Sequence, residues 1–174
     1  MPLRRQITVV GAAACDGATA AVARACGESV ARAGATLICG GRGGVMAAAA
    51  EGAKDAGGLV VGVLPGPDAD VSPPNDHLDV VLYSGMLQAR NQVLVLSADA
   101  VIAIGGGWGT LSEIAFALKF RIPVVLLDSW QLQRPDGLSD PMLFHARTPE
   151  DAVRIALEAR RKARTATPDP GARD

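Results

Sequence analysis

The 174-residue sequence has few aromatic side chains and no excess of charge of either sign. Aromatic residues make up 3% of the chain, too few for the stacking surfaces on which proteins hold single-stranded nucleic acids. Lys and Arg total 17 and Asp and Glu total 18, which leaves a formal net charge of -1 and no basic surface for phosphate backbones. These absences predict that no nucleic-acid polymer is a partner.

Cysteines and long apolar runs are scarce as well. Cys15, Cys26 and Cys39 are far apart without Cys-x-x-Cys spacing, which predicts reduced thiols in a cytoplasmic protein. No cluster of His, Cys and Asp has the spacing of a metal site, so no metal is expected. No apolar run reaches 18 residues, and we expect neither a membrane span nor a membrane partner. The apolar stretch before Gly11 imitates a short export signal, but a first strand that ends at a glycine turn explains it better.

Glycine is abundant, with 20 residues, and short apolar runs alternate with Ala-rich segments of helical period. The runs are continuously apolar, which is typical of parallel strands covered by helices on both faces. Strands are predicted at residues 6–10, 35–39, 59–64, 80–83, 100–104 and 123–127. Helices are predicted at residues 18–33, 45–56, 86–97, 111–120 and from 149 onward. This order predicts an α/β, Rossmann-like fold with a doubly wound, mainly parallel sheet of six to seven strands and helices on both faces.

The length fits one domain, which we place at residues 1–164 as a Rossmann-like nucleotide-binding domain. Residues 165–174 contain mainly Pro, Gly, Ala and charged side chains and are expected to form a disordered tail. Residues 131–142 are predicted to be an irregular excursion. The last helix has Thr148 as its predicted N-cap.

Glycine-rich turns follow three of the predicted strands, at Gly11, at residues 40–44 and at residues 105–109. In such a sheet ligands bind beyond the carboxyl ends of the strands. The last two turns place unhindered backbone amides directly before a helix, where the helix dipole also favours a phosphate. Neither is a P-loop, because no Lys follows the last glycine, and the turn at Gly11 lacks the dinucleotide fingerprint. We therefore predict a phosphorylated small molecule as the ligand and no resident cofactor.

Two side chains near these loops could carry chemistry. Glu113 lies behind Gly109, early in a predicted helix. It is either a general base or hydroxyl acceptor, or an acid that stabilises the helix N-terminus by about 0.3–1 kcal/mol. Arg90 lies near the start of the helix after the fourth strand and therefore at the same edge of the sheet. Its spacing alone favours a solvated or salt-bridged arginine.

The segment Gly105–Glu113 (GGGWGTLSE) is similar to the PGGxGTxxE motif of the Lonely Guy family of cytokinin-activating phosphoribohydrolases. Residues 86–91 (MLQARN) resemble that family's methionine-to-arginine-lysine segment, and residues 39–53 resemble its first glycine loop, GGGxxGLM. The likeness extends from about residue 7 to residue 128. It implies a Rossmann-like fold, a homodimer or homotetramer, and a site for a nucleoside 5′-monophosphate.

The resemblance also implies roles for individual residues. Arg90 and Glu113 would be the catalytic pair that hydrolyses the N-glycosidic bond, with Glu113 acting on water and Arg90 steadying the substrate or the leaving base. The second loop and the threonine would hold the phosphate, through Gly106, Gly107, Gly109 and Thr110. The first glycine loop would add further phosphate contacts, from Gly41, Arg42, Gly43 and Gly44. Weaker site-lining candidates are Gly11, Asp16, Asn91, Trp108 and Asp128.

For two of these candidates a structural alternative stays open. Trp108 would either stack on a ligand ring or cover a dimer contact, and the contact is favoured. For Asp128 the structural and functional interpretations are about even.

Three departures from the family motif favour a different activity. Gly105 replaces a proline, Asn91 replaces a lysine and Ser112 replaces a glutamate, so the site loses two charges. Such changes are typical of a sister branch that includes molybdenum-cofactor carrier proteins, in which the same loops would hold the pterin phosphate without a catalytic base. A phosphoribohydrolase and a non-catalytic carrier or sensor of a phosphorylated cofactor therefore both stay open.

A lysine decarboxylase, a label often given to relatives of this fold, is not favoured. A pyridoxal Schiff base needs a lysine at the site. The sequence has only three lysines, all inside or late in predicted helices: Lys54, Lys119 and Lys162.

Overall fold

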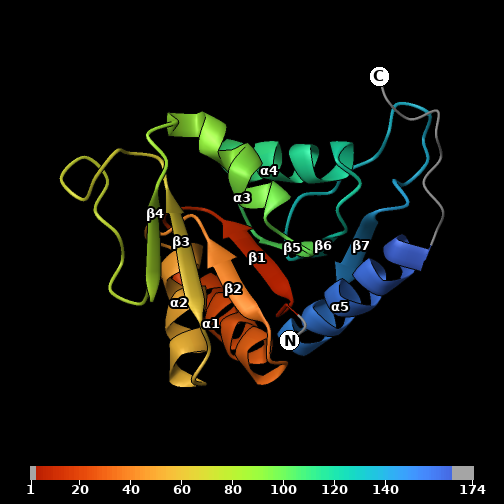
Figure 1. Cartoon of the computed structure of the whole chain (residues 1–174). Coiled ribbons are helices and arrows are strands. Elements are labelled where there is room, and N and C mark those ends of the chain that lie inside the picture. Colours follow the sequence, from red (N-terminus) through yellow and green to blue (C-terminus); the bar gives the residue numbers. More distant parts are fainter. Residues whose placement is uncertain (1–2, 166–174) are drawn as a thin grey trace.

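The computed structural model describes residues 3–165 and shows a seven-stranded sheet in which every strand is parallel to its neighbours (Figure 1). The strands are β1 (Gln6–Gly11), β2 (Thr36–Cys39), β3 (Val60–Leu64), β4 (Val80–Tyr83), β5 (Ala100–Ile104), β6 (Val124–Leu127) and β7 (Leu143–Ala146). The helices are α1 (Gly17–Arg32), α2 (Val45–Asp55), α3 (Arg90–Leu96), α4 (Trp108–Lys119) and α5 (Pro149–Thr165). The predicted fold class is confirmed.

The sheet grows outward from β1 in two directions, in the order β4-β3-β2-β1-β5-β6-β7. The chain builds one half through β2, β3 and β4, then crosses back to place β5 on the other side of β1. The loops that follow the neighbouring strands β1 and β5 therefore run in opposite directions from each other. Such a topological switch point is where folds of this kind bind their ligands.

Helices cover both faces of the sheet: α1, α2 and α5 lie on one face, and α3 and α4 lie on the other (Figure 1). Strand β5 shows why its sequence is continuously apolar. Ile102 and Ile104 pack into the cluster with α1, α2 and α5, whereas Val101 and Ala103 pack into the cluster with α3 and α4. Alternate side chains on a strand point to opposite faces, so both sets must be apolar.

Three boundaries differ from the sequence prediction. Helix α4 begins at Trp108 instead of residue 111. The sequence indicates a later start because glycine, which flanks Trp108 on both sides, has a low helix propensity. Helix α3 begins at Arg90, behind a short 3-10 turn, η1 (Leu87–Ala89), within the stretch predicted as one helix. Strand β7 was not predicted individually, because this short edge strand is only partly buried and lacks a continuous apolar run. With β7 the sheet has seven strands, the larger of the two numbers predicted.

Other expectations concern the ends of the chain and the membrane. Residues 131–142 contain no helix or strand, as predicted. The predicted disordered tail lies outside the described residues, apart from Thr165, which ends α5. Among residues 3–165 no helix has the length and apolar character that crossing a bilayer requires.

Helices α1 and α2 touch backbone to backbone through two glycines. A Cβ atom added to Gly27 would lie 1.9 Å from the carbonyl oxygen of Ala49, and one added to Gly52 would lie 2.0 Å from the carbonyl oxygen of Arg24. Both distances are below any real contact, so an added methyl group would force the helices apart.

We predict that Gly27→Ala destabilises the protein by about 1–3 kcal/mol, because overpacking outweighs the better helix propensity of alanine. Gly17→Ala is the matched control, since a Cβ at the start of α1 meets no atom within 4 Å. This control is expected to leave stability unchanged or raise it by up to about 1 kcal/mol. Urea unfolding of both variants measures the difference, and equal midpoints would contradict the close helix contact.

Candidate functional site

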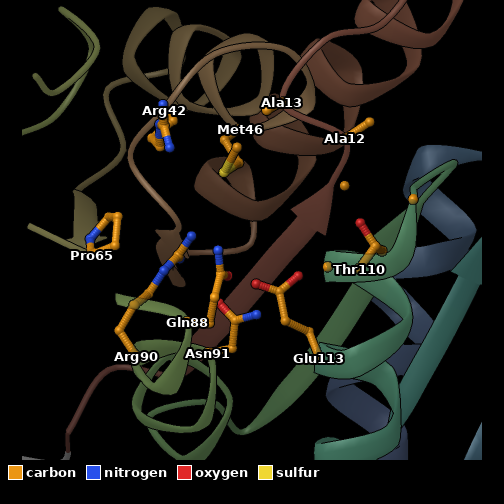
Figure 2. A pocket seen from close by; sticks show the side chains of 13 residues that line it. Ala12, Ala13, Arg42, Met46, Pro65, Gln88, Arg90, Asn91, Thr110 and Glu113 are labelled. Carbon is orange, nitrogen blue, oxygen red and sulfur yellow. The ribbon is translucent and has the colours of Figure 1, made fainter. Parts of the chain in front are cut away.

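A pocket of about 280 Å³ lies at the carboxyl edge of the sheet (Figure 2). Its lining follows the ends of β1 to β5 and consists of Gly11, Ala12, Ala13, Arg42, Met46, Pro65, Gln88, Arg90, Asn91, Gly107, Gly109, Thr110 and Glu113. This volume is near the lower limit of small-molecule sites, which span roughly 300–1,000 Å³. The pocket suits one small ligand.

The N-terminus of α4 forms one end of this pocket. Gly107 is the N-cap of α4 and no side chain bonds to the first amides, so the first turn presents free N–H groups. The Thr110 hydroxyl points into the same hollow as the Glu113 carboxylate (Figure 2). Gly106, with φ of 114°, makes this arrangement possible, because a Cβ there would lie 2.5 Å from the Cβ of Thr110. The end of the pocket therefore has donors and a positive helix dipole for an anion.

The N-terminus of α2, behind the first glycine loop, is arranged differently. The amide of Val45 donates a 3.0 Å hydrogen bond to the carbonyl oxygen of Ala12. A Cβ on Gly44, with φ of 61°, would lie 2.3 Å from that same oxygen. The glycines thus let the β1–α1 loop approach α2, and the two glycine loops are not equivalent anion sites. Arg42 is the only predicted phosphate contact of the first loop whose residue lines the pocket.

Glu113 lies in the second turn of α4 and is 6% exposed. Within the described residues its carboxylate forms no hydrogen bond or ion pair. Burial raises its pKa from the ordinary 4.5 to about 7, and the positive charge of Arg90 opposes that rise. The helix-start alternative for Glu113 is wrong, because the first turn of α4 contains no acidic residue. Glu113 is a carboxyl group that changes protonation near neutral pH.

Arg90 is 8% exposed and begins α3. Its Nε and Nη1 atoms are buried and have no hydrogen-bond partner among the described residues, so the solvated or salt-bridged alternative is wrong. The guanidinium lies against Gly40, where an added Cβ would be 2.5 Å from Nη1. The neighbouring Cys39 supplies no anion, because burial raises the pKa of its thiol to about 11. Burial of the guanidinium also lowers the pKa of Arg90, although the negative charge of Glu113 opposes this.

Asn91 and Ser112, two of the three departures from the family motif, are bonded to each other. The Ser112 hydroxyl donates to the Gly109 carbonyl oxygen over 2.7 Å, so its oxygen accepts from Nδ2 of Asn91 over 3.1 Å. These two hydrogen bonds in series fix the orientation of the Asn91 amide. Its Oδ1 atom is left buried without a partner, in a side chain 4% exposed. A neutral pair thus occupies two positions that are charged in the family motif.

The structure brings eight of the predicted site residues to this one pocket and leaves seven outside its lining. Those in the lining are Gly11, Arg42, Arg90, Asn91, Gly107, Gly109, Thr110 and Glu113. Those outside it are Asp16, Gly41, Gly43, Gly44, Gly106, Trp108 and Asp128. The glycines among the second set shape the two loops.

The three non-glycine residues outside the lining have structural contacts of their own, which for Asp128 is a contact of its backbone. Asp16 is the N-cap of α1 and accepts from the Thr19 amide over 2.8 Å, which lowers its pKa. The carbonyl oxygen of Asp128 accepts from the Gly105 amide over 3.1 Å, which ties the loops after β5 and β6 together. Trp108 is 80% exposed and lies 5.5 Å from the ring of Trp130.

Five lining residues were not predicted from the sequence. They are Ala12, Ala13, Met46, Pro65 and Gln88. Each follows the carboxyl end of a strand, and that position is a signal by which they could have been found. Met46 and Gln88 also lie in the two segments that resemble the family motifs. None of the lining residues is a lysine, so the pocket does not fit a pyridoxal Schiff base. Among residues 3–165 no group of three or more His, Cys, Asp or Glu side chains could hold a metal ion.

Comparisons with known proteins place this geometry in context. The model of the SLOG cluster4 family matches residues 4–153. An uncharacterized protein of Archaeoglobus fulgidus is 44% identical over 154 residues, which are 88% of this chain and 95% of that relative. The cytokinin riboside 5′-monophosphate phosphoribohydrolase of Mycobacterium tuberculosis is 30% identical over 111 residues, or 60% of this chain and 59% of that enzyme. The structure of the molybdenum cofactor binding protein of Rippkaea orientalis is 36% identical, with a TM-score of 0.81, over 90% of this chain and 97% of that one.

We predict that Glu113 makes the stability of the protein depend on pH. Its pKa is about 7 when folded and 4.5 ordinarily, so between these values the folded protein binds more protons and stability falls as pH rises. The shift corresponds to roughly 3 kcal/mol, present below pH 4.5 and lost above pH 7. Glu113→Gln cannot ionise, so at pH 8 it should gain stability relative to the wild type, with the gain shrinking toward pH 5. Urea unfolding at both pH values measures this, and a constant difference between the two proteins would exclude a buried titrating carboxyl.

Proposed function

The chain belongs to the SLOG cluster4 family, and on this premise we propose that it is a non-catalytic carrier or sensor of a phosphorylated cofactor of the molybdenum-cofactor type. Its pocket would hold the phosphorylated pterin, with the phosphate at the N-terminus of α4. The family lies within the Lonely Guy-like superfamily, whose molybdenum-cofactor carrier branch this chain resembles in fold and sequence.

One observation carries the proposal: an uncapped helix N-terminus and a buried, unpartnered arginine line the same pocket. The amides of α4 and the Thr110 hydroxyl offer donors to one phosphate. Arg90 has buried donor atoms that no protein group satisfies, and such atoms cost free energy until an acceptor arrives. Each of these features favours the binding of an anionic group.

Two features favour a carrier over an enzyme. The neutral Asn91–Ser112 pair removes charges that could polarise a bond during the reaction. The Rippkaea orientalis protein, whose structure is similar over 90% of this chain at 36% sequence identity, also supports the carrier. A carrier needs reversible binding and no bond cleavage, which these features permit.

A second candidate is the phosphoribohydrolase, and the pKa of Glu113 is the observation that favours it. A carboxyl group that titrates near 7 is well matched to general acid–base catalysis. As a carboxylate it would take a proton from water while the water oxygen attacks the ribose carbon and the bond from that carbon to the base nitrogen breaks. The proton would then pass to the departing base. Arg90 would then hold the departing base from the other side. This candidate uses the same phosphate site as the carrier.

Further parts of the proposal concern assembly and location. We propose a homodimer or homotetramer, and exposed apolar side chains on β4, η1 and α3 offer a surface for it: Leu82, Leu87, Val93 and Leu96. A cytoplasmic location, the single-domain boundary and the absence of nucleic-acid and membrane partners stay predictions from the sequence.

The proposed phosphate site predicts that Thr110→Val weakens ligand binding about tenfold or more, because it removes one hydrogen bond to a charged group. Thr36→Val is the matched control, at the start of β2 and away from the pocket lining. Titration of 6-hydroxymethylpterin phosphate by calorimetry measures the affinity, with dephosphorylated pterin as the control ligand. The fluorescence of Trp108 and Trp130, the two tryptophans of the chain, is a second readout, because Trp108 begins α4 and its ring lies beside that of Trp130. If both threonine variants bind alike, the phosphate does not sit at α4.

The carrier proposal also predicts no turnover of nucleoside monophosphates. Incubation with AMP and its analogues should release no free base and no ribose 5-phosphate, because the site has lost two of its motif's charges. Release of base that disappears in Glu113→Ala would replace the carrier by the second candidate. Release that survives this substitution would reject the proposed role of Glu113 as well.

A further inference from the structure

We infer that the pocket is built for a small phosphorylated ligand with a second anionic group at its other end. This inference rests on the proposed phosphate site and goes beyond it by naming the class of ligand. Its basis is that the pocket has two separate positive ends, of which a single phosphate neutralises one.

The first positive end is the N-terminus of α4, with Thr110 beside it. It contains no cationic side chain, and its attraction comes from free amides and the helix dipole. The second positive end consists of Arg42 and Arg90, which extend from the loop after β2 and from the start of α3. In Figure 2 the two arginines lie on one side of the pocket and Thr110 and Glu113 on the other, with Met46 and Gln88 between them.

The arginine end has no counter-charge in the described part of the chain. No ion pair within 4 Å joins a carboxylate to Arg42 or to Arg90. Arg42 and Arg90 line the same side of the pocket (Figure 2), and the charge of Arg42 contributes to the lowered pKa of Arg90. Cys39 is a neutral thiol, and Glu113 is only partly ionised at neutral pH. Arg42 and Arg90 therefore form a cationic end that the protein does not neutralise.

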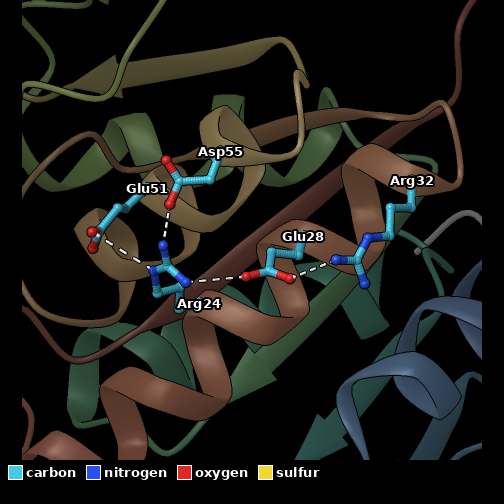
Figure 3. Close-up of polar contacts among 5 residues, drawn as sticks. All are labelled: Arg24, Glu28, Arg32, Glu51 and Asp55. Carbon is cyan, nitrogen blue, oxygen red and sulfur yellow. Dashed lines mark hydrogen bonds and ion pairs between the residues drawn. The ribbon is translucent and has the colours of Figure 1, made fainter.

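Several arginines elsewhere in the described part of the chain form ion pairs with carboxylates. Arg24 contacts Glu28, Glu51 and Asp55, and Arg32 bonds to Glu28 over 3.0 Å (Figure 3). These ion pairs are on the surface, where water screens the charges and an unpaired arginine would cost little free energy. Arg90 is the buried arginine, and both its Nε and its Nη1 lack a hydrogen-bond partner among the described residues. Nη1 of Arg5 also lacks a hydrogen bond, but Arg5 is more exposed and lies 3.7 Å from Asp99. A buried guanidinium without a partner is costly, so a ligand group is the expected source of its missing acceptors.

A ligand with one phosphate and a neutral ring would leave one of these ends unsatisfied. A ligand with an anion at each end would neutralise both and gain charge-assisted hydrogen bonds at each. The class is therefore a phosphorylated compound of pocket size whose far end carries a phosphate, carboxylate or other oxyanion. A simple nucleoside monophosphate, with an uncharged base, fits less well.

The test compares fructose 6-phosphate with fructose 1,6-bisphosphate by calorimetry at one ionic strength. We expect the bisphosphate to bind at least tenfold more tightly to the wild type. Arg42→Gln, a change at an exposed side chain, should lower that ratio about tenfold, because it removes a charge from the second end. Thr110→Val should weaken both ligands by similar factors and keep the ratio. Arg32→Gln removes the same charge far from the pocket and should also keep the ratio.

The outcomes separate this inference from the proposed function. Equal affinities of the two sugars for the wild type would overturn the two-anion inference. A ratio that Arg42→Gln leaves unchanged would overturn it too, because both arginines and α4 would then serve one phosphate. In either case, monophosphate binding that depends on Thr110 would keep the proposed phosphate site. If neither sugar binds and no pterin phosphate binds, both proposals fail.

Discussion

Burial of the parallel strands on both faces decides where this protein can bind a ligand. Side chains of β5 point alternately into two apolar clusters, which leaves no room for polar chemistry within the sheet. Polar groups that must meet a ligand are therefore confined to the edges, and the carboxyl edge has the loops that begin helices. Residues that follow β1 to β5 converge there on one pocket, although they come from segments up to about 100 residues apart.

Within that edge, the two glycine loops serve different purposes. At α2 the glycines allow the carbonyl of Ala12 to reach the first helical amide, so protein atoms occupy the place of an anion. At α4, Gly106 accommodates Thr110 instead, and the first amides stay free of side-chain caps. The difference follows from which neighbour lies opposite each helix N-terminus. Glycine in a strand-to-helix turn thus indicates close approach, and only its surroundings decide whether a ligand or the protein approaches.

The electrostatics of the pocket depend on burial more than on pairing. Glu113 and Arg90 are both buried and form no ion pair, so each is shifted toward its neutral form. Asn91 and Ser112 replace a charged pair with a neutral one directly beside them. The negative charge that would pair with Arg90 is therefore left for a ligand to supply. Such a balance suits an anion that must enter and leave, which links the buried arginine to the proposed carrier function.

The sequence by itself determined the parallel α/β fold, the positions of both glycine loops and the candidacy of Arg90 and Glu113. These properties are local, because apolar runs, glycine turns and motif spacing can be recognised within short segments. Only the tertiary structure decided that α2 is closed by Ala12, that Asn91 bonds to Ser112 and that Arg90 has no partner. Each of these facts depends on contacts between segments distant in sequence. Whether a donor is satisfied is set by the atoms folded against it, and no local pattern records them.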